Sequence, residues 1–254
     1  MQKAFIIFSF LVLPYVYGQE NKASEIIIGI GILHVNTTYP IYLYKGINDT
    51  LPFADIVFKK HKSGTTTIST ALDLKPNSIS EGGTHKADRK LIKSGLAPTS
   101  KQLNFIVTEA SEYYFKVVTN KETNEAFFIK REKQHVYYKT KGALFQNSCS
   151  NCGDSNYNPR WFIFETWERY LKRVHYIEKP NLILYDKPNG DIIFKNNDHS
   201  FLPFNVVEVK GDWIKLKKAT GRENMFDASE NYDGWTQWKN GNEILITIIE
   251  SIFI

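Results

Sequence analysis

Two stretches of the chain share one strand–turn–strand pattern, and this repeat restricts the fold more than any other feature of the sequence. Phe105–Val118 reads FIVTEASEYYFKVV, and Phe204–Lys217 reads FNVVEVKGDWIKLK. When they are aligned without a gap, the same Phe, Val, Glu and Lys positions coincide, and Tyr114 falls opposite Trp213. Apolar residues alternate with polar ones on both sides of each turn, as in hairpins with one buried face. The sequence therefore predicts two equivalent β-hairpins.

The similarity continues upstream of both hairpins. Ile41–Phe58 reads IYLYKGINDTLPFADIVF and Leu182–Phe194 reads LILYDKPNGDIIF, so that Tyr44 aligns with Tyr185 and the two Asp-Ile-x-Phe motifs, which begin at Asp55 and Asp191, also align. One unit therefore occurs twice, over Val35–Arg131 (the first unit) and Pro180–Glu250 (the second unit).

Aromatic residues make up 14% of the chain and cluster with Val and Ile in short runs. Such runs favour strands over helices, and the C-terminal run ILITIIESIFI is also interpreted as a strand. The sequence thus predicts a mainly β protein.

The first unit carries an insertion, residues 59–104, that the second unit lacks. Its stretches SGTTTIST, SEGGTH and SGLAPTS indicate loops, and HKADRKLIKSG indicates one short helix that ends at Gly95. The insertion is strongly basic, because three acidic residues, Asp73, Glu81 and Asp88, stand against nine basic ones: Lys59, Lys60, Lys62, Lys75, Lys86, Arg89, Lys90, Lys93 and Lys101. It is either a solvated loop or a contact surface for an anionic partner, such as lipid headgroups, an acidic wall polymer or an acidic protein.

A linker joins the two units. Its first part, ALFQNSCSNCGDSNYNP, is rich in turn-forming residues. In the following WFIFETWERYLKRV, the apolar residues Phe164, Trp167, Leu171 and Val174 have helical spacing. This spacing predicts a short amphipathic helix over 166–172, with its apolar face in the core.

The second unit has a strand that ends in Leu184-Tyr185, a loop with Pro, Asn and Gly over Asp186–Gly190, the strand pair VEVKGDWIKL over Val207–Leu216, and GWTQW over Gly234–Trp238. In these motifs it resembles the bacterial SH3-like (SH3b) domain. The first unit departs from the pattern, since SEYY replaces the Gly-Asp-Trp turn and Phe127 stands where a Gly-Trp pair is expected. The resemblance implies two small SH3-like β-barrels joined by a short helix. It also implies a binding role, toward cell-wall peptides or protein surfaces.

The N-terminus has the layout of a secretory signal peptide. Lys3 precedes the apolar run Ala4–Val16, and Val16 and Gly18 occupy the small-residue positions of a cleavage site. We therefore expect export to the periplasm or beyond the cell, which disfavours nucleic acid as a partner. The expected organisation is a signal peptide (1–18), a first SH3-like domain (19–140, with the basic insertion 59–104), a linker (141–178) and a second SH3-like domain (179–254).

Cys149 and Cys152 are the two cysteines of the chain, in SCSNCGD. In an exported protein, such a pair in a turn-rich stretch is expected to form a structural disulfide. A redox motif would place the first cysteine at the start of a helix. A zinc site would need two further ligands, for which His135 and His175 qualify by residue type alone. All three alternatives stay open at this stage.

The sequence contains no recognisable catalytic constellation. Its histidines show no H-x-x-H or H-E-x-x-H spacing, no serine stands in G-x-S-x-G, and no Gly-rich phosphate loop is present. The sequence therefore predicts a binding module and not an enzyme, with no cofactor and no metal. The alternatives are a disulfide- or metal-dependent envelope enzyme that uses the cysteine loop, and an interaction or immunity-type protein that binds an acidic partner through the basic insertion.

The predicted ligand is a peptide, a glycopeptide or a protein surface of the cell envelope. Aromatic side chains around the hairpin of the second unit are expected to contact the apolar parts of this ligand, and a carboxylate at the rim is expected to bind an amine of the ligand. The predicted binding residues are Tyr185, Asp212, Trp213, Asp233, Trp235 and Trp238.

Overall fold

The structure is a computed structural model that describes residues 27–62, 66–76, 80–81, 96–97, 102–147, 158–174, 176–196, 202, 204–218 and 233–250. The first part of the chain forms β1 (Gly31–Asn36), β2 (Ile41–Leu43), β3 (Ala54–Lys60), β4 (Thr66–Ser69), β5 (Ser80–Glu81), β6 (Leu96–Ala97), β7 (Gln102–Ala110), β8 (Tyr114–Asn120), β9 (Glu125–Lys130) and β10 (Val136–Tyr138). The middle part forms α2 (Lys141–Asn147), β11 (Trp161–Thr166) and α3 (Trp167–Arg173). The last part forms β12 (Tyr176–Glu178), β13 (Ile183–Tyr185), β14 (Ile192–Lys195), β15 (Phe204–Lys210), β16 (Trp213–Lys218), β17 (Gly234–Gln237), β18 (Lys239–Asn240), β19 (Glu243–Ile244) and β20 (Thr247–Glu250).

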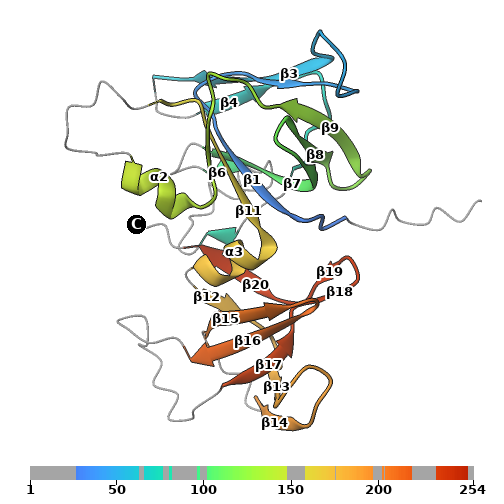
Figure 1. The fold of residues 1–254 in the computed structure, drawn as a ribbon, viewed down its shortest axis with the longest axis vertical. Coiled ribbons are helices and arrows are strands. Elements are labelled where there is room, and N and C mark those ends of the chain that lie inside the picture. The colour runs from blue at the N-terminus through green and yellow to red at the C-terminus, as the bar shows by residue number, and fades with distance from the viewer. Residues whose placement is uncertain are drawn as a thin grey trace, which may run out of the picture.

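The prediction of a mainly β fold is confirmed. Each of the two helices in the described part of the chain has only seven residues. Figure 1 shows most strands of the first unit in its upper half and those of the second unit in its lower half, with α3 between them. The upper sheet has the order β10-β11-β1-β7-β8-β9, and the lower sheet has the order β14-β13-β17-β16-β15-β12-β20-β5. The strands β2, β3 and β4 form a further sheet, which two backbone hydrogen bonds of 2.9 Å between Tyr44 and Phe128 connect to β9.

The two repeated hairpins pair their strands in the same register. The rungs of β7 and β8 match those of β15 and β16 under the gapless alignment: Val107–Val117 and Val206–Leu216, Glu109–Lys116 and Glu208–Lys215, Ala110–Phe115 and Val209–Ile214. Both hairpins also shift register at the same aligned position, between Val107 and Glu109 and between Val206 and Glu208. A β-bulge strongly twists the strand that carries it, so the alternating pattern and the bulge together give the two hairpins one shape.

The hairpins differ in how they turn. In the second, Gly211 has φ of 58° while Asp212 has negative φ, as in the tight type II′ turn that favours glycine first. The first hairpin has no glycine in its turn. There, the hydroxyl oxygen of Ser111 accepts hydrogen bonds from the backbone of Tyr113 and of Tyr114. A serine side chain thus supports the turn that glycine supports in the other unit.

Two details of the sequence alignment are corrected by the strand pairing. Phe128, and not Phe127, occupies the rung of Trp235, because Phe128 pairs with Lys116 and Tyr44 as Trp235 pairs with Lys215 and Tyr185. The Asp-Ile-x-Phe motifs are not equivalent either. Asp55 lies within β3 opposite Tyr42, whereas Asp191 lies in the turn before β14. The physical reason is the longer tip between β2 and β3, which shifts the returning strand.

The insertion and the linker contain more regular structure than their composition indicates. Parts of the predicted loops form β4, β5 and β6, of which β4 is rich in the β-branched Thr, and β5 pairs in parallel with β20 of the second unit. The linker contributes α2 and also β11, which lies beside β1 in the upper sheet. Neighbouring strands supply pairing that local composition does not encode, and this is why the strands β4, β5, β6 and β11 were not predicted.

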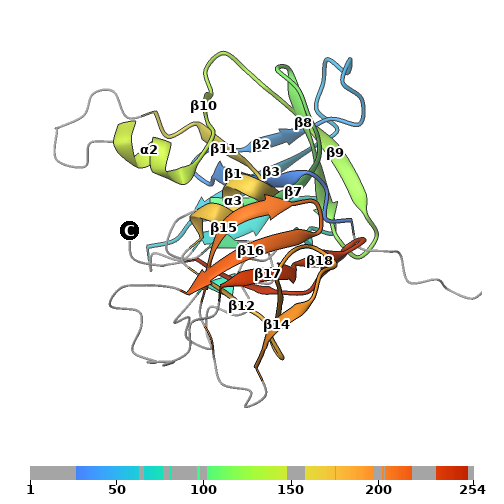
Figure 2. The ribbon, with the colours of Figure 1, turned by 60° about the horizontal axis from the view of Figure 1, so that its bottom comes forward.

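The predicted linker helix is confirmed as α3. Thr166 is its N-cap, since the side-chain oxygen accepts a hydrogen bond from the backbone of Arg169. Trp167, Tyr170 and Leu171 are buried on its apolar face. Figure 2 shows α3 across β15, and α3 also contacts β1 and β11. The predicted C-terminal strand is confirmed over Thr247–Glu250, as β20, and residues 251–254 lie outside the described part of the chain.

Strand β1 contributes buried side chains to the cores of both units. Its residues Leu33 and Val35 belong to the core of the first unit, together with Phe105 and Val117. Ile32 points to the opposite face and joins the core of the second unit, which surrounds α3. Because successive side chains of a strand alternate between its faces, one short strand packs against both units.

Several predictions concern residues outside the described part of the chain. These are the signal peptide (1–18), the pair Cys149 and Cys152, the candidate ligand His175 and the helix predicted to end at Gly95. Among the described residues, no helix has the length and apolar character that crossing a bilayer requires.

Candidate functional site

The outer face of the second sheet carries a row of side chains that runs across five strands. Cross-strand pairing places Ile192 beside Tyr185, Tyr185 beside Trp235, Trp235 beside Lys215, and Lys215 beside Glu208. Directly paired residues project on the same side of a sheet, so this row is continuous. It is apolar at β14 and charged at β15. We call it the aromatic row, and it includes Trp213, whose ring meets that of Tyr185 edge-to-face at 5.3 Å between centroids.

The predicted aromatic residues differ in their exposure to solvent. Tyr185 and Trp213 are half-buried and reachable from solvent, whereas Trp235 is only 8% exposed. Trp238 is 2% exposed and belongs to the core, where its ring lies 5.5 Å from that of Trp167 and its Nε1 donates to the Gly211 carbonyl at 2.9 Å. Trp238 therefore supports the hairpin from inside and does not line a surface groove, which corrects the sequence-based expectation.

The two predicted carboxylates have different surroundings. Asp212 is engaged within the protein: its Oδ1 lies 2.9 Å from Lys239 Nζ, and its backbone oxygen accepts a hydrogen bond from Trp238. Asp233 is exposed directly before β17. Since Asp212 is neutralised by Lys239, only Asp233 remains as a rim carboxylate of the predicted type.

The first unit has an equivalent row in which the charges are paired. The row begins at Tyr44, directly after β2, and continues across β9, β8 and β7 with Phe128, Lys116 and Glu109. Lys116 Nζ lies 2.7 Å from Glu109 Oε1 and 5.5 Å from the ring centre of Phe128. In the second unit, Lys215 and Glu208 form no ion pair with each other or with any other residue that the structure describes. Lys215 and Glu208 are therefore available to pair with charged groups of a ligand at this end of the aromatic row.

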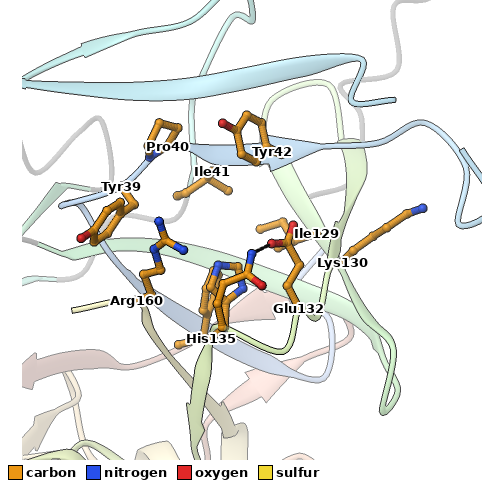
Figure 3. A pocket seen from close by; sticks show the side chains of 11 residues that line it. Tyr39, Pro40, Ile41, Tyr42, Ile129, Lys130, Glu132, His135 and Arg160 are labelled. Atoms are coloured by element: carbon orange, nitrogen blue, oxygen red, sulfur yellow. Dashed lines mark hydrogen bonds between the residues drawn. The ribbon is translucent and has the colours of Figure 1, made fainter. Parts of the chain in front are cut away.

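A pocket of about 110 Å³ lies elsewhere, in the first unit, between the approach to β2, the segment after β9 and the start of β11 (Figure 3). The lining residues with polar or aromatic side chains include Tyr39, Tyr42, Glu132, Gln134, His135 and Arg160. The guanidinium of Arg160 lies over the ring of Tyr39, 4.3 Å from its centre. We call this site the Arg160 pocket.

Hydrogen bonds fix the ring of His135 in the wall of this pocket. Its Nδ1 lies 3.1 Å from the hydroxyl of Tyr137, which itself accepts a hydrogen bond of 3.0 Å from the backbone of Glu132. Burial lowers the pKa of His135, the charge of Glu132 opposes this shift, and the charge of Arg160 adds to it. Burial also raises the pKa of the Tyr137 hydroxyl. At neutral pH, both groups are therefore uncharged.

A second polar cluster is enclosed between the units. Glu165 on β11 accepts hydrogen bonds from Arg173 of α3 at 2.6 and 2.7 Å, and its Oε2 lies 3.1 Å from His34 Nε2. Glu165 and His34 are fully buried. These contacts connect β1, β11 and α3.

The arrangement of ionisable side chains offers no metal centre within the described residues. No three His, Cys, Asp or Glu side chains there converge as ligands. His135, one of the two histidines considered for zinc, uses Nδ1 in its contact with Tyr137.

Sequence reasoning missed several site residues. Lys215 and Glu208 were visible as aligned positions of the repeat, and their outward alternation was the signal that could have added them to the site. Arg160, Tyr39 and Tyr42 gave no signal, because they are far apart along the chain and meet through the pairing of β11 in the first sheet.

Comparison with known proteins adds no relative. No family model, no curated protein and no solved structure matches the chain.

Proposed function

We propose that the protein is an exported, non-enzymatic binding module of SH3-like architecture that holds a peptide or glycopeptide of the cell envelope on the aromatic row. One observation carries the proposal: an apolar and aromatic strip on the second sheet ends in a lysine and a glutamate that have no partner among the described residues. An extended peptide presents apolar surface and both charges at short intervals, and it matches such a strip.

The contrast between the two units supports the choice of the second one. In the first unit, Glu109 already neutralises Lys116, and the exposed end of its row offers no open charge. In the second unit, Lys215 and Glu208 keep their capacity for a charged ligand group. Trp213 and Tyr185 supply the apolar contact, and aromatic anchors of this kind often contribute on the order of 2 kcal/mol each.

Equivalent substitutions in the two units test the proposal. Soluble peptides and glycopeptides released from the cell envelope are passed over immobilised protein, and retained molecules are then titrated. We expect Trp213→Ala to weaken binding about 30-fold, which corresponds to about 2 kcal/mol. Lys215→Gln is expected to weaken binding of charged ligands.

The matched controls are Tyr114→Ala and Lys116→Gln, which change the equivalent positions of the first unit. Both should bind like the unchanged protein. The proposal fails if no envelope fragment is retained, or if the first-unit changes weaken binding as much as those of the second unit.

A further inference from the structure

The Arg160 pocket contains a cation that has no acceptor among the described residues. Four arginine side chains lie in the described part of the chain, and three of them donate hydrogen bonds: Arg131 to the Ser111 carbonyl, Arg169 to the Phe164 carbonyl and Arg173 to Glu165. For the guanidinium of Arg160, no acceptor is found among the described residues. Its five donors therefore remain for water or for a ligand.

Contacts with neighbouring residues hold this guanidinium in place. The ring of Tyr39 supports one face, and Asn158 accepts the backbone N–H of Arg160 at 2.8 Å. Asn158 is itself fixed, since its amide donates to the Gln134 carbonyl at 2.9 Å. An arginine that is stacked on a ring loses little further freedom when it binds a carboxylate with its planar fork of donors.

The acidic residue of the pocket does not compete for Arg160. The carboxylate of Glu132 accepts a hydrogen bond from the side-chain amide of Gln134 (Figure 3). This bond directs one carboxylate oxygen toward Gln134. Among the described residues, Glu132 is thus held by Gln134 and forms no ion pair with Arg160.

His135 adds a neutral polar group to the same wall. Its Nδ1 lies 3.1 Å from the Tyr137 hydroxyl, which also accepts the Glu132 N–H. The ring of His135 lies 4.7 Å from that of Phe162, which holds it in place.

The remaining wall of the pocket is aromatic and apolar. Tyr39 is 38% exposed and Tyr42 is 44% exposed, and both line the pocket together with Pro40. We propose that the Arg160 pocket binds a carboxylate attached to an aromatic or apolar body, with Arg160 as the ion-pairing group and Tyr39 and Tyr42 against the body. A free organic acid and the C-terminus of a peptide share this chemistry. The site is separate from the aromatic row.

The test uses N-acetyl-phenylalanine as the probe and N-acetyl-phenylalanine amide as its uncharged counterpart. Binding to the purified chain is followed by NMR, through the amide signals of Ile129 and Gln134 and the ring signals of His135. We expect the acid to shift these signals and the amide to bind at least about tenfold more weakly, since hydrogen bonds to a charged group contribute more than neutral ones. Equal binding of acid and amide would overturn the proposal.

Variants assign the effect to the pocket. Arg160→Gln should weaken binding of the acid about tenfold or more, Arg160→Lys should weaken it less, and Lys210→Gln, which removes an exposed cation on β15, should leave it unchanged. Unchanged binding in Arg160→Gln would refute the assignment, and the thermal midpoint of each variant checks that it is folded. Trp213→Ala should also bind the acid normally, so that failure here and failure at the aromatic row are distinguishable.

Two further probes separate the sources of the carboxylate and the nature of the site. Benzoate represents a free organic acid, and a tripeptide ending in Phe, compared with its C-terminal amide, represents a peptide terminus. Preference for either one supports the proposal and names the source. Inorganic phosphate that displaces the acid at equal concentration would overturn it, because the aromatic walls would then contribute nothing.

Discussion

His34 on β1 and Glu165 on β11 lie on adjacent strands with Nε2 and Oε2 3.1 Å apart, and neither side chain reaches solvent. The second carboxylate contact comes from α3, where Arg173 donates two hydrogen bonds to Glu165. On its other side, Nδ1 of His34 lies 2.5 Å from Oδ1 of Asn104 on β7. One buried cluster thus connects three strands of the upper sheet with the helix between the units.

This cluster predicts acid sensitivity of the fold. Burial raises the pKa of Glu165, but hydrogen bonds from His34 and Arg173 outweigh it and lower the pKa from 4.5 to about 2. A carboxyl group whose folded pKa is depressed stabilises the protein above its unfolded pKa, and this stabilisation is lost as the pH falls from about 4.5 toward 2. The contribution is on the order of 3 kcal/mol. Urea unfolding at a series of pH values should show the loss.

Glu165→Gln should flatten that pH dependence between about pH 4.5 and 2, the range that the two pKa values define. The control is Glu168→Gln, which removes an exposed carboxylate on the neighbouring helix and should keep most of the slope. A slope that survives in Glu165→Gln would contradict the assignment.

Removing Arg173 should be far more damaging than removing its neighbour. Arg173→Met leaves the buried Glu165 carboxylate without its bidentate partner, and breaking a buried pair in this way costs about 3–5 kcal/mol. Lys172→Met breaks only the exposed pair with Glu168 on the same helix and should change stability little. Chemical denaturation of both variants at pH 7 measures the difference, and similar losses would show that burial of Glu165 is not decisive.

Alanine substitutions at two glycines, Gly211 in the turn of the second hairpin and Gly142 in α2, should change the stability of the protein in opposite directions. Gly211 has φ of 58° and an added Cβ would meet nothing within 4 Å, so Gly211→Ala costs only the backbone strain, about 1–2 kcal/mol. Gly142 lies in α2 with ordinary helical backbone, and Gly142→Ala should stabilise by about 0.4–1 kcal/mol. Thermal unfolding distinguishes the two signs. Stabilisation by Gly211→Ala would exclude the type II′ turn.

Two tryptophans of the second unit should respond differently to truncation. Trp238→Ala removes a core side chain and is expected to cost about 3–5 kcal/mol. Trp213→Ala removes a half-buried ring and should cost clearly less stability, while it weakens ligand binding. Denaturation midpoints for both variants check the order, and a larger loss in Trp213→Ala would place Trp213 in the core.

Features with local patterns could be predicted from the sequence. The hairpins followed from alternation, and α3 followed from helical spacing and was confirmed with Thr166 as its cap. The burial of Trp238 could not be predicted, because alternation past Gly234 gives no indication of which tryptophan faces the core. The Arg160 pocket was equally hidden, since Tyr39 and Arg160 meet only when β11 is placed beside β1. Long-range pairing of short strands determines both outcomes, and no local pattern encodes it.

The position of β1 has a consequence for the order in which the chain folds during synthesis. Strand β1 is the earliest described strand to be made, yet both of its partners follow much later, β7 first and then β11. The first unit therefore completes its sheet only after the segment that carries β11 and α3 has emerged from the ribosome. Ile32 becomes buried later still, since the core that covers it contains residues of the second unit. Although the sequence repeats, the first unit cannot complete its folding before the second unit is made. In a chain stalled between the two units, the face of β1 that carries Ile32 would remain uncovered.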